Sequence, residues 1–135
     1  MIARIYLWIC AIVFLGLGVA LMFWPVEILK SVEVSFTSPT AFADIRADYG
    51  GCIFGLGAFL VVCASRATRV RLGLLCTGLT FSGYALGRLL SLALDGMPKQ
   101  IIFTLIVVEV IGAAVAFALM PLAASMTKIQ LPSEN

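Results

Sequence analysis

The sequence predicts an all-α protein, a four-helix transmembrane bundle with both termini in the cytoplasm. Of the 135 residues, 62% are hydrophobic and 12% are charged, whereas about a quarter of the residues in a soluble globular domain are charged. Four long apolar segments alternate with short stretches that contain charge, proline or both. Lysine and arginine are distributed unevenly among those stretches. The chain, residues 1–135, is therefore expected to form a single membrane domain.

Four segments are long enough to cross a bilayer, which takes about 20 mostly apolar residues. They are residues 5–24, 47–64, 72–94 and 101–124. The first ends in "FWP", where aromatic rings suit the headgroup region and proline stops the helix. Its apolar stretch is about twice as long as a signal-peptide core, and no A-x-A site follows, so we expect it to be retained. Residues 125–135 are expected to form a cytoplasmic tail.

The second helix is predicted to begin before its apolar segment. In "SPTAFADIRADYGG" (38–51), Ser38 occupies an N-cap position and Pro39 the first helical position. A helix from Pro39 to Ala64 is about 39 Å long, so its first turns would lie in the membrane interface. The preceding "VEILKSVEVSF" (26–36) fits either a short amphipathic strand or a surface helix.

The orientation follows from the distribution of basic residues. The loop "SRATRVR" (65–71) carries three arginines, Arg4 precedes the first span, and Lys128 follows the fourth. All five basic residues fall on one side, which the positive-inside rule makes cytoplasmic. Residues 25–45 and 95–100 then face outward. We expect a multi-pass protein of a bacterial inner membrane.

The third segment carries its polar side chains on one helical face, except for Ser82 and the weakly polar Cys76. The side chains on this face recur at intervals of three or four residues: Thr77, Thr80, Tyr84, Arg88, Ser91 and Asp95. Lipid would not accept such a face, so we expect it to point into the bundle or into a hydrated space.

Arg88 and Glu109 are predicted to form an ion pair. Arg88 lies about 9 Å below the outer end of its helix at 1.5 Å per residue. Glu109 is the only ionisable residue of the fourth segment and lies about 12 Å below the same side. Charged side chains at such depths need partners. Nearly equal depth on consecutive antiparallel helices makes each the natural partner of the other.

The pair is expected to belong to a polar cluster in the outer half of the bundle, lining a cavity that opens outward. The candidate binding residues are Arg46, Asp48, Tyr49, Tyr84, Arg88, Ser91, Asp95 and Glu109. Three interpretations remain open: an ion pair that only locks helices together, a site for a ligand or substrate, and a contact surface for another membrane protein. Cys10, Cys63 and Cys76 are expected to lie away from the cluster, toward the cytoplasmic side.

Glycines are expected to allow close helix packing. The candidates are two small-x-x-x-small pairs, Gly51 with Gly55 and Gly83 with Gly87, together with Gly112. Further glycines add to this set: Gly16, Gly18, Gly50 and Gly57. They suit packing within one protomer or between two copies of the chain.

Other site chemistries find little support in the composition. The chain has no histidine, which argues against haem, di-iron and most catalytic zinc sites. Its four cysteines include no C-x-x-C pair, so we interpret them as small buried residues. The net charge of +2 without a basic, aromatic cluster argues against nucleic acid. No catalytic residue, metal site or cofactor is predicted.

Two stretches, "IRADYGGCIFGLGAFLV" (45–61) and "GRLLSLALDGMP" (87–98), together with Glu109, resemble a bacterial family of small four-helix membrane proteins. The family is known only as domain of unknown function 4345, and the resemblance covers about residues 5–124. Its recurrent elements correspond to Arg46, Tyr49, Gly50, Gly51, Gly87, Arg88, Asp95, Gly96, Pro98 and Glu109. More remotely, the layout is similar to DoxX-type four-helix proteins, some of which accompany quinone-linked oxidoreductases. Neither resemblance implies an activity.

The leading hypothesis is a non-enzymatic protein that binds a lipid, a small molecule or a membrane partner through the polar cluster. Anionic headgroups would suit Arg46 and Arg88. Membrane lipids, a partner membrane protein or further copies of the chain are the expected partners. The alternatives are a small proton-coupled transporter that uses Glu109, and an accessory subunit of a quinone-linked membrane oxidoreductase.

Overall fold

The computed structural model describes the chain through Ile129 and its side chains through Ala123. Its helices are α1 (Ile2–Phe23), α2 (Pro25–Lys30), α3 (Pro39–Asp44), the π-helix η1 (Ile45–Gly51), α4 (Cys52–Ser65), the 3₁₀ turn η2 (Ala67–Arg69), α5 (Val70–Leu94) and α6 (Gln100–Ile129). Residues 1–129 contain no strand, which confirms the all-α prediction. The last residues of the predicted tail, 130–135, lie outside the described part, and α6 runs past the predicted span end at residue 124.

Local sequence signals explain most of the boundaries. The Ser38 side chain accepts a hydrogen bond from the Ala41 backbone N–H at 3.1 Å, so the predicted N-cap is present and α3 begins at Pro39. Pro25 starts α2 immediately after α1 ends. Of the stretch left open, residues 26–30 are therefore helical, whereas residues 31–36 form a turn and an irregular loop, so that no strand is present there. Gly96, at φ +95°, makes the turn between α5 and α6.

Three helical segments are long and apolar enough to cross a membrane. They are Ile2–Phe23, Pro39–Ser65 and Gln100–Ala123, judged by length and composition. The 25-residue α5 is not among them, because its polar face lowers its mean hydropathy. Three of the four predicted spans are thus long and apolar enough to cross a membrane. The exception is the predicted span 72–94 in α5, which is less apolar because it carries polar residues of the candidate site.

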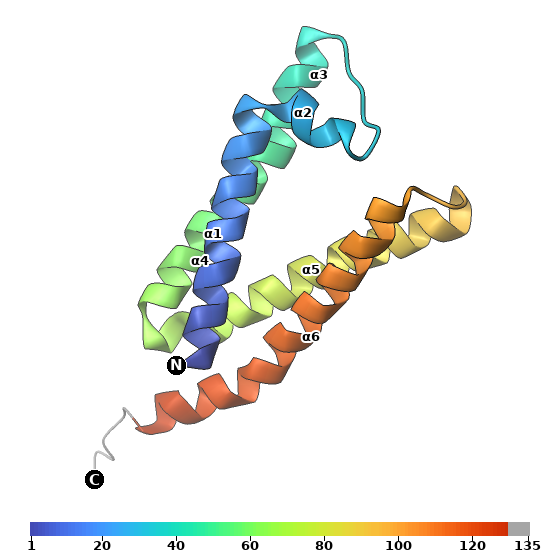
Figure 1. The fold of residues 1–135 in the computed structure, drawn as a ribbon. Coiled ribbons are helices and arrows are strands. Elements are labelled where there is room, and N and C mark those ends of the chain that lie inside the picture. The colour runs from blue at the N-terminus through green and yellow to red at the C-terminus, as the bar shows by residue number, and fades with distance from the viewer. Residues whose placement is uncertain (130–135) are drawn as a thin grey trace.

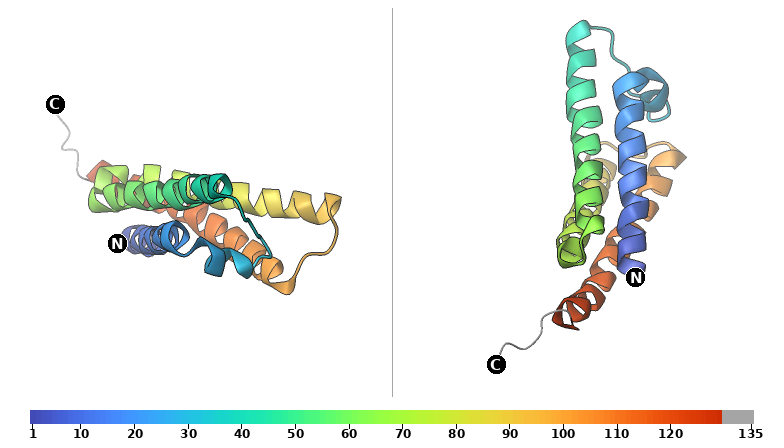
Figure 2. Two further views of the ribbon diagram at one scale, coloured as in Figure 1. Left: turned by 90° about the horizontal axis from the view of Figure 1, so that it is seen from above. Right: turned by 90° about the vertical axis from the view of Figure 1, so that its left-hand side faces the viewer.

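The long helices form two antiparallel hairpins rather than one closed bundle. The first hairpin pairs α1 with the continuous run α3–η1–α4, and the second pairs α5 with α6. Each helix contacts its own partner far more extensively than the other hairpin. Figure 1 shows that the hairpins meet near the start of α1 and diverge toward the end that carries α2 and α3, and Figure 2 gives two further views. The start of α1 and the end of α6 lie at the same end, called here the closed end.

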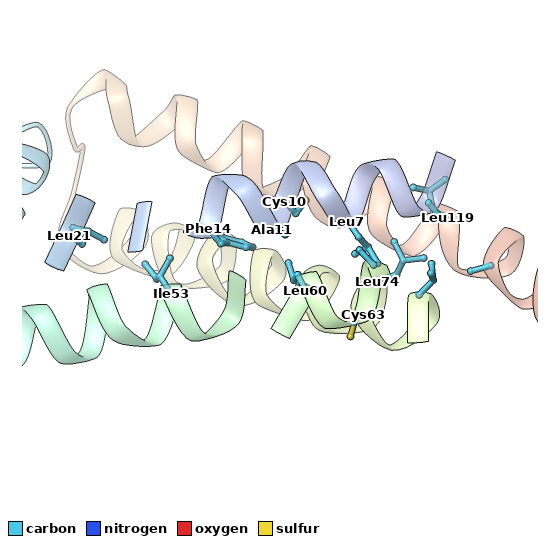
Figure 3. Packing of buried hydrophobic residues seen from close by; sticks show 14 of the residues in the cluster. Leu7, Cys10, Ala11, Phe14, Leu21, Ile53, Leu60, Cys63, Leu74 and Leu119 are labelled. Carbon is cyan, nitrogen blue, oxygen red and sulfur yellow. The ribbon is translucent and has the colours of Figure 1, made fainter. Parts of the chain in front are cut away.

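The hydrophobic core joins the two hairpins near the closed end. Along α1 the buried positions alternate at intervals of three and four residues: Ala3, Leu7, Cys10, Phe14, Gly18 and Leu21. This spacing keeps one stripe of α1 turned inward. Figure 3 shows Leu7 and Phe14 beside Leu60 of α4 and Leu74 of α5, with Leu119 of α6 completing the contact. Toward the diverging end the core is confined to the first hairpin, where Leu21 and Ile53 belong to it.

The glycines that allow close packing in the first hairpin are not those of the two small-x-x-x-small pairs but Gly18 and Gly57, which were also among the candidates. A Cβ on Gly18 would lie 2.5 Å from the Phe54 backbone nitrogen, and one on Gly57 would lie 2.7 Å from that of Leu15. These contacts bring α1 and α4 together. Gly112 is close to the Phe81 ring, as predicted for a packing residue.

The predicted pairs Gly51/Gly55 and Gly83/Gly87 were wrong as packing sites within the protomer. Gly51 makes ordinary contacts, and no atom lies within 4 Å of a Cβ built on the other three. The spacing alone identifies a face, but the phase of the helix decides whether that face meets a neighbour.

Candidate functional site

The Arg88 guanidinium and the Glu109 carboxylate form a salt bridge between α5 and α6. The Nε of Arg88 donates to Oε1 at 2.9 Å and to Oε2 at 3.1 Å. One N–H is therefore shared by both carboxylate oxygens. The predicted contact is present, and its two partners come from the helices that sequence reasoning assigned.

Burial differs sharply between the two partners. The Glu109 side chain is 7% exposed, whereas that of Arg88 is 31% exposed. Glu109 lies on the α6 face that also buries Ala113 and Ala116, so α6 turns the carboxylate inward against α5. Such a carboxylate is costly to bury without a partner, and the Arg88 guanidinium is the partner that it has.

The polar face of α5 is turned toward the first hairpin. Phe81, on this face, packs against Phe14 of α1 with ring centroids 5.5 Å apart. The Tyr84 phenol is within electrostatic range of Arg88 and Glu109, and also of Tyr49 and Cys52 from the first hairpin. We name Tyr49, Cys52, Tyr84, Arg88 and Glu109 the interhairpin cluster. Its members come from η1 and α4 of the first hairpin and from α5 and α6 of the second.

The exposures within the interhairpin cluster show that side chains do not seal it. Tyr49 is 51% exposed and Tyr84 is 38% exposed. Farther toward the closed end, Thr77 is fully buried, and its hydroxyl donates to the Gly73 carbonyl at 2.8 Å. Thr77 is therefore satisfied within its own helix, whereas the polar groups around Arg88 remain accessible.

The terminal nitrogens of Arg88 have no hydrogen-bond partner among the described residues. Both hydrogen bonds of its side chain use Nε. A guanidinium has five N–H donors, so four remain on Nη1 and Nη2. No buried side-chain nitrogen or oxygen in the described part lacks a partner. The unused nitrogens of Arg88 are therefore at its exposed end.

Two predicted members of the site, Ser91 and Asp95, pair with each other instead. The Ser91 hydroxyl donates to the Asp95 carboxylate at 2.7 Å, and both residues are exposed at the end of α5. The Asp95 backbone N–H also bonds to the Ser91 carbonyl. These local contacts lie at the C-terminal end of α5 and do not involve the Arg88–Glu109 pair.

Arg46 and Asp48 do not assemble into the predicted outer part of the site. The Arg46 guanidinium lies over the Phe42 ring, 5.6 Å from its centroid, and both Arg46 and Asp48 are exposed. The reason is the π-helix η1, which spans Ile45–Gly51. Its i→i+5 bonding changes the direction of side chains relative to an α-helix. Of the predicted residues in η1, only Tyr49 reaches the interhairpin cluster. The sequence signal for the irregularity is the consecutive pair Gly50–Gly51 within an otherwise helical run.

Sequence reasoning missed two residues near the site. Tyr6 of α1 donates its hydroxyl to the Gly112 carbonyl at 2.7 Å, one turn along α6 from Glu109. Cys52 is exposed and within electrostatic range of Tyr84. The interpretation of the cysteines as buried therefore holds for Cys10 and Cys63, holds in part for the half-buried Cys76, and is wrong for Cys52. A lone tyrosine inside an apolar span was the available signal for Tyr6.

A separate groove runs along the other flank of the second hairpin. It is lined by Ser82, Ala85, Leu86, Leu89, Val110 and Ala113. None of these belongs to the cavity predicted from the sequence. Among the described residues, no three cysteine or acidic side chains come together as a metal site would require.

The fold and the site define a class: a helical protein with membrane-length apolar helices and, in its described part, an Arg–Glu pair that joins the two helices of the second hairpin. Within that class, the chain belongs to the family described as domain of unknown function 4345, whose profile matches residues 2–120. The resemblance seen in the sequence is thereby confirmed at the family level. No curated protein and no solved structure matches the chain significantly.

Proposed function

We propose that this is a four-span bacterial inner-membrane protein that binds an amphiphilic molecule from the bilayer at the interhairpin cluster. Both termini lie in the cytoplasm in this proposal, and α5 is the fourth span. The remote similarity to DoxX-type proteins remains an expectation from the sequence and is not needed for this proposal.

The case for α5 as a span rests on its length and its neighbours. It has 25 residues, about 38 Å at 1.5 Å per residue. It pairs along its length with the apolar α6. The one charged side chain within its apolar stretch, residues 72–94, is that of Arg88, which is neutralised by Glu109. The arginine-rich loop of residues 65–71 lies at the closed end, where α1 begins and α6 ends. This placement agrees with the positive-inside rule for a protein with both termini in the cytoplasm.

The position of the Arg88–Glu109 pair carries the binding proposal. A buried ion pair is weak evidence for stability, because apolar side chains of similar size often pack as well. This pair is also accessible, since the Arg88 side chain is 31% exposed, and the Tyr84 phenol is within electrostatic range both of the pair and of Tyr49 in the first hairpin. A polar group with accessible donors between apolar helices matches the usual anatomy of a small-molecule site.

A membrane-dissolved amphiphile is the occupant that fits these surroundings. Large apolar side chains are exposed along all four long helices, so an acyl chain finds apolar contact wherever it enters. The interhairpin cluster then receives the polar end. Tyr84 and Tyr49 suit this boundary, because each combines an apolar ring with a polar hydroxyl.

Native mass spectrometry of protein released from host membranes tests the proposal. The wild type is compared with the double variant Arg88→Leu/Glu109→Leu, which removes both charges together and leaves no unpaired charge in the site. We expect a lipid-sized adduct on the wild type that is absent from the double variant, with equal helical circular dichroism. Ser82→Ala, on the other flank of α5, is the matched control and keeps the adduct. Identical adducts on all three proteins would mean that the pair is only structural.

A further inference from the structure

The ligand's head can be assigned a chemical class from the way Arg88 is paired. Resting on the binding function proposed above, we infer that the head is an uncharged oxygen acceptor of the carbonyl type, as in an acyl ester, held by Nη1 and Nη2 of Arg88. The assignment follows from which atoms of the pair are occupied and from the balance of charge around it.

The occupied atoms determine whether the site offers donors or acceptors. Both oxygens of Glu109 receive the Nε–H of Arg88, and the carboxylate is 7% exposed. The terminal nitrogens of Arg88 have no hydrogen-bond partner among the described residues. They belong to Arg88, which is the more exposed member of the Arg88–Glu109 pair. A guanidinium donates and never accepts. The site therefore presents donors to an incoming molecule, which excludes an ammonium head.

The charge balance separates an uncharged acceptor from an anion. Glu109 already neutralises Arg88. The other members of the interhairpin cluster are two phenols and a thiol, which supply no positive charge. Arg46, the cation that the sequence placed here, lies instead over the Phe42 ring. An anion would enter a site without a second cation and beside a buried carboxylate, at the desolvation cost of an uncompensated charge.

A carbonyl oxygen avoids that cost while using the same donors. It has two lone pairs, so it can accept from Nη1 and Nη2 together. Hydrogen bonds to charged donors are stronger than those between neutral groups. The ester oxygens of a glycerolipid lie at the boundary between headgroup and acyl chain. Arg88, about 9 Å below the end of α5, lies near the depth of that boundary.

Four amphiphiles, each with a twelve-carbon chain, test the assignment. They compete for the purified protein in detergent micelles, and native mass spectrometry measures the adduct that each one forms. They are glycerol monolaurate with an ester carbonyl, 1-dodecylglycerol with an ether, dodecyl phosphate with an anionic head, and dodecyltrimethylammonium with a cationic head. We expect the ester to be bound about tenfold over the matched ether, and also ahead of both charged probes.

Three variants test whether the preference for the ester depends on Arg88. The double variant Arg88→Leu/Glu109→Leu should lose the preference for ester over ether. Ser82→Ala removes a hydroxyl outside the interhairpin cluster, in the groove on the other flank of α5, and should keep the preference. Leu89→Trp partly fills the groove on the other flank of α5 and should also keep the preference.

The outcomes distinguish this inference from the binding proposal on which it rests. If ester and ether bind equally, or if dodecyl phosphate binds best, the assignment is wrong, although amphiphile binding stands. If none of the four binds the wild type, the binding proposal itself fails. A preference for ester that survives in the double variant would place the ligand away from Arg88.

Discussion

Tyr6 of α1 donates its hydroxyl to the backbone carbonyl of Gly112 on α6, at 2.7 Å. Gly112 follows Glu109 by one helical turn and lies against the Phe81 ring. This hydrogen bond ties the first hairpin to the second next to the site. It therefore helps to fix the two hairpins relative to each other beside the site.

Replacing Tyr6 by phenylalanine should loosen that connection. The ring remains and only the hydroxyl is lost, so we expect a decrease in stability of about 0.5–1.5 kcal/mol. Unfolding in mixed micelles with increasing SDS measures it, and Tyr84→Phe is the control, because the Tyr84 hydroxyl makes no hydrogen bond within the described part of the chain. An unchanged unfolding midpoint in Tyr6→Phe would show that the two hairpins are held together by other contacts.

The Arg88–Glu109 pair should behave as a coupled unit. Arg88→Leu leaves a carboxylate that is 7% exposed without its cation, so we expect a loss of about 3–5 kcal/mol. Glu109→Leu should cost less, since the partly exposed guanidinium can reach water. The double variant should be more stable than Arg88→Leu, and a double-mutant cycle in detergent measures the coupling. Additive effects of the two single changes would rule out a direct interaction.

The glycine contacts predict which substitutions break the first hairpin. Gly18→Ala and Gly57→Ala force a Cβ against the backbone of the facing helix, so both should destabilise the protein by more than about 1 kcal/mol. Gly83→Ala and Gly87→Ala place the same atom in open space within the protomer. They should be neutral or slightly stabilising, because alanine favours helix. Unfolding in mixed micelles with increasing SDS compares the four.

The Gly83→Ala and Gly87→Ala variants also test for self-association. If Gly83→Ala or Gly87→Ala weakens the protein while shifting its oligomeric state in cross-linking, the Gly83/Gly87 face packs against a second copy. If their stability and oligomeric state are unchanged, these glycines have no packing role.

The loop residue Glu33 predicts an unusual gain on substitution. Glu33 is the only described residue other than glycine with positive φ, at 62°, and its carboxylate pairs with Lys99 Nζ at 2.7 Å in an exposed position. Left-handed backbone costs a residue with a Cβ about 1 kcal/mol or more, whereas an exposed ion pair contributes at most about 1 kcal/mol. We expect Glu33→Gly to be as stable as the wild type or more so. Lys99→Ala, which removes only the pair, should lose less than about 1 kcal/mol, and thermal unfolding compares the two.

The proposed topology predicts opposite locations for two loops. Reporter fusions at Arg69 and at Lys99 should report the cytoplasmic and the outer side respectively, because α5 separates them and the arginine-rich loop stays inside. A phosphatase reporter, active only outside, and a fluorescent reporter, active only inside, give complementary signals. The same location for both fusions would show that α5 does not cross the membrane.

Much of the local structure could be predicted because it depends on neighbours in the chain. Ser38 and Pro39 mark the start of a helix through capping chemistry. The intervals between the polar residues of α5 place them on one face, whatever that face meets. The Arg88–Glu109 contact was within reach of sequence reasoning for the same reason: a short connection makes α5 and α6 antiparallel neighbours, and counting residues from the turn gives matching depths.

The remaining features depend on distances and rotations between segments that no local pattern encodes. Whether Gly18 or Gly83 meets another helix depends on the phase of each helix about its axis, and that phase is set by all contacts at once. The π-helix shifts that phase within the second segment, which takes Arg46 to Phe42 and leaves Tyr49 near Tyr84. By itself, the sequence determined the helices, the polar face and the ion pair. Only the tertiary structure decided that the two hairpins join loosely and that the end of Arg88 stays accessible, because the helices of each hairpin pack against each other far more extensively than against the other hairpin.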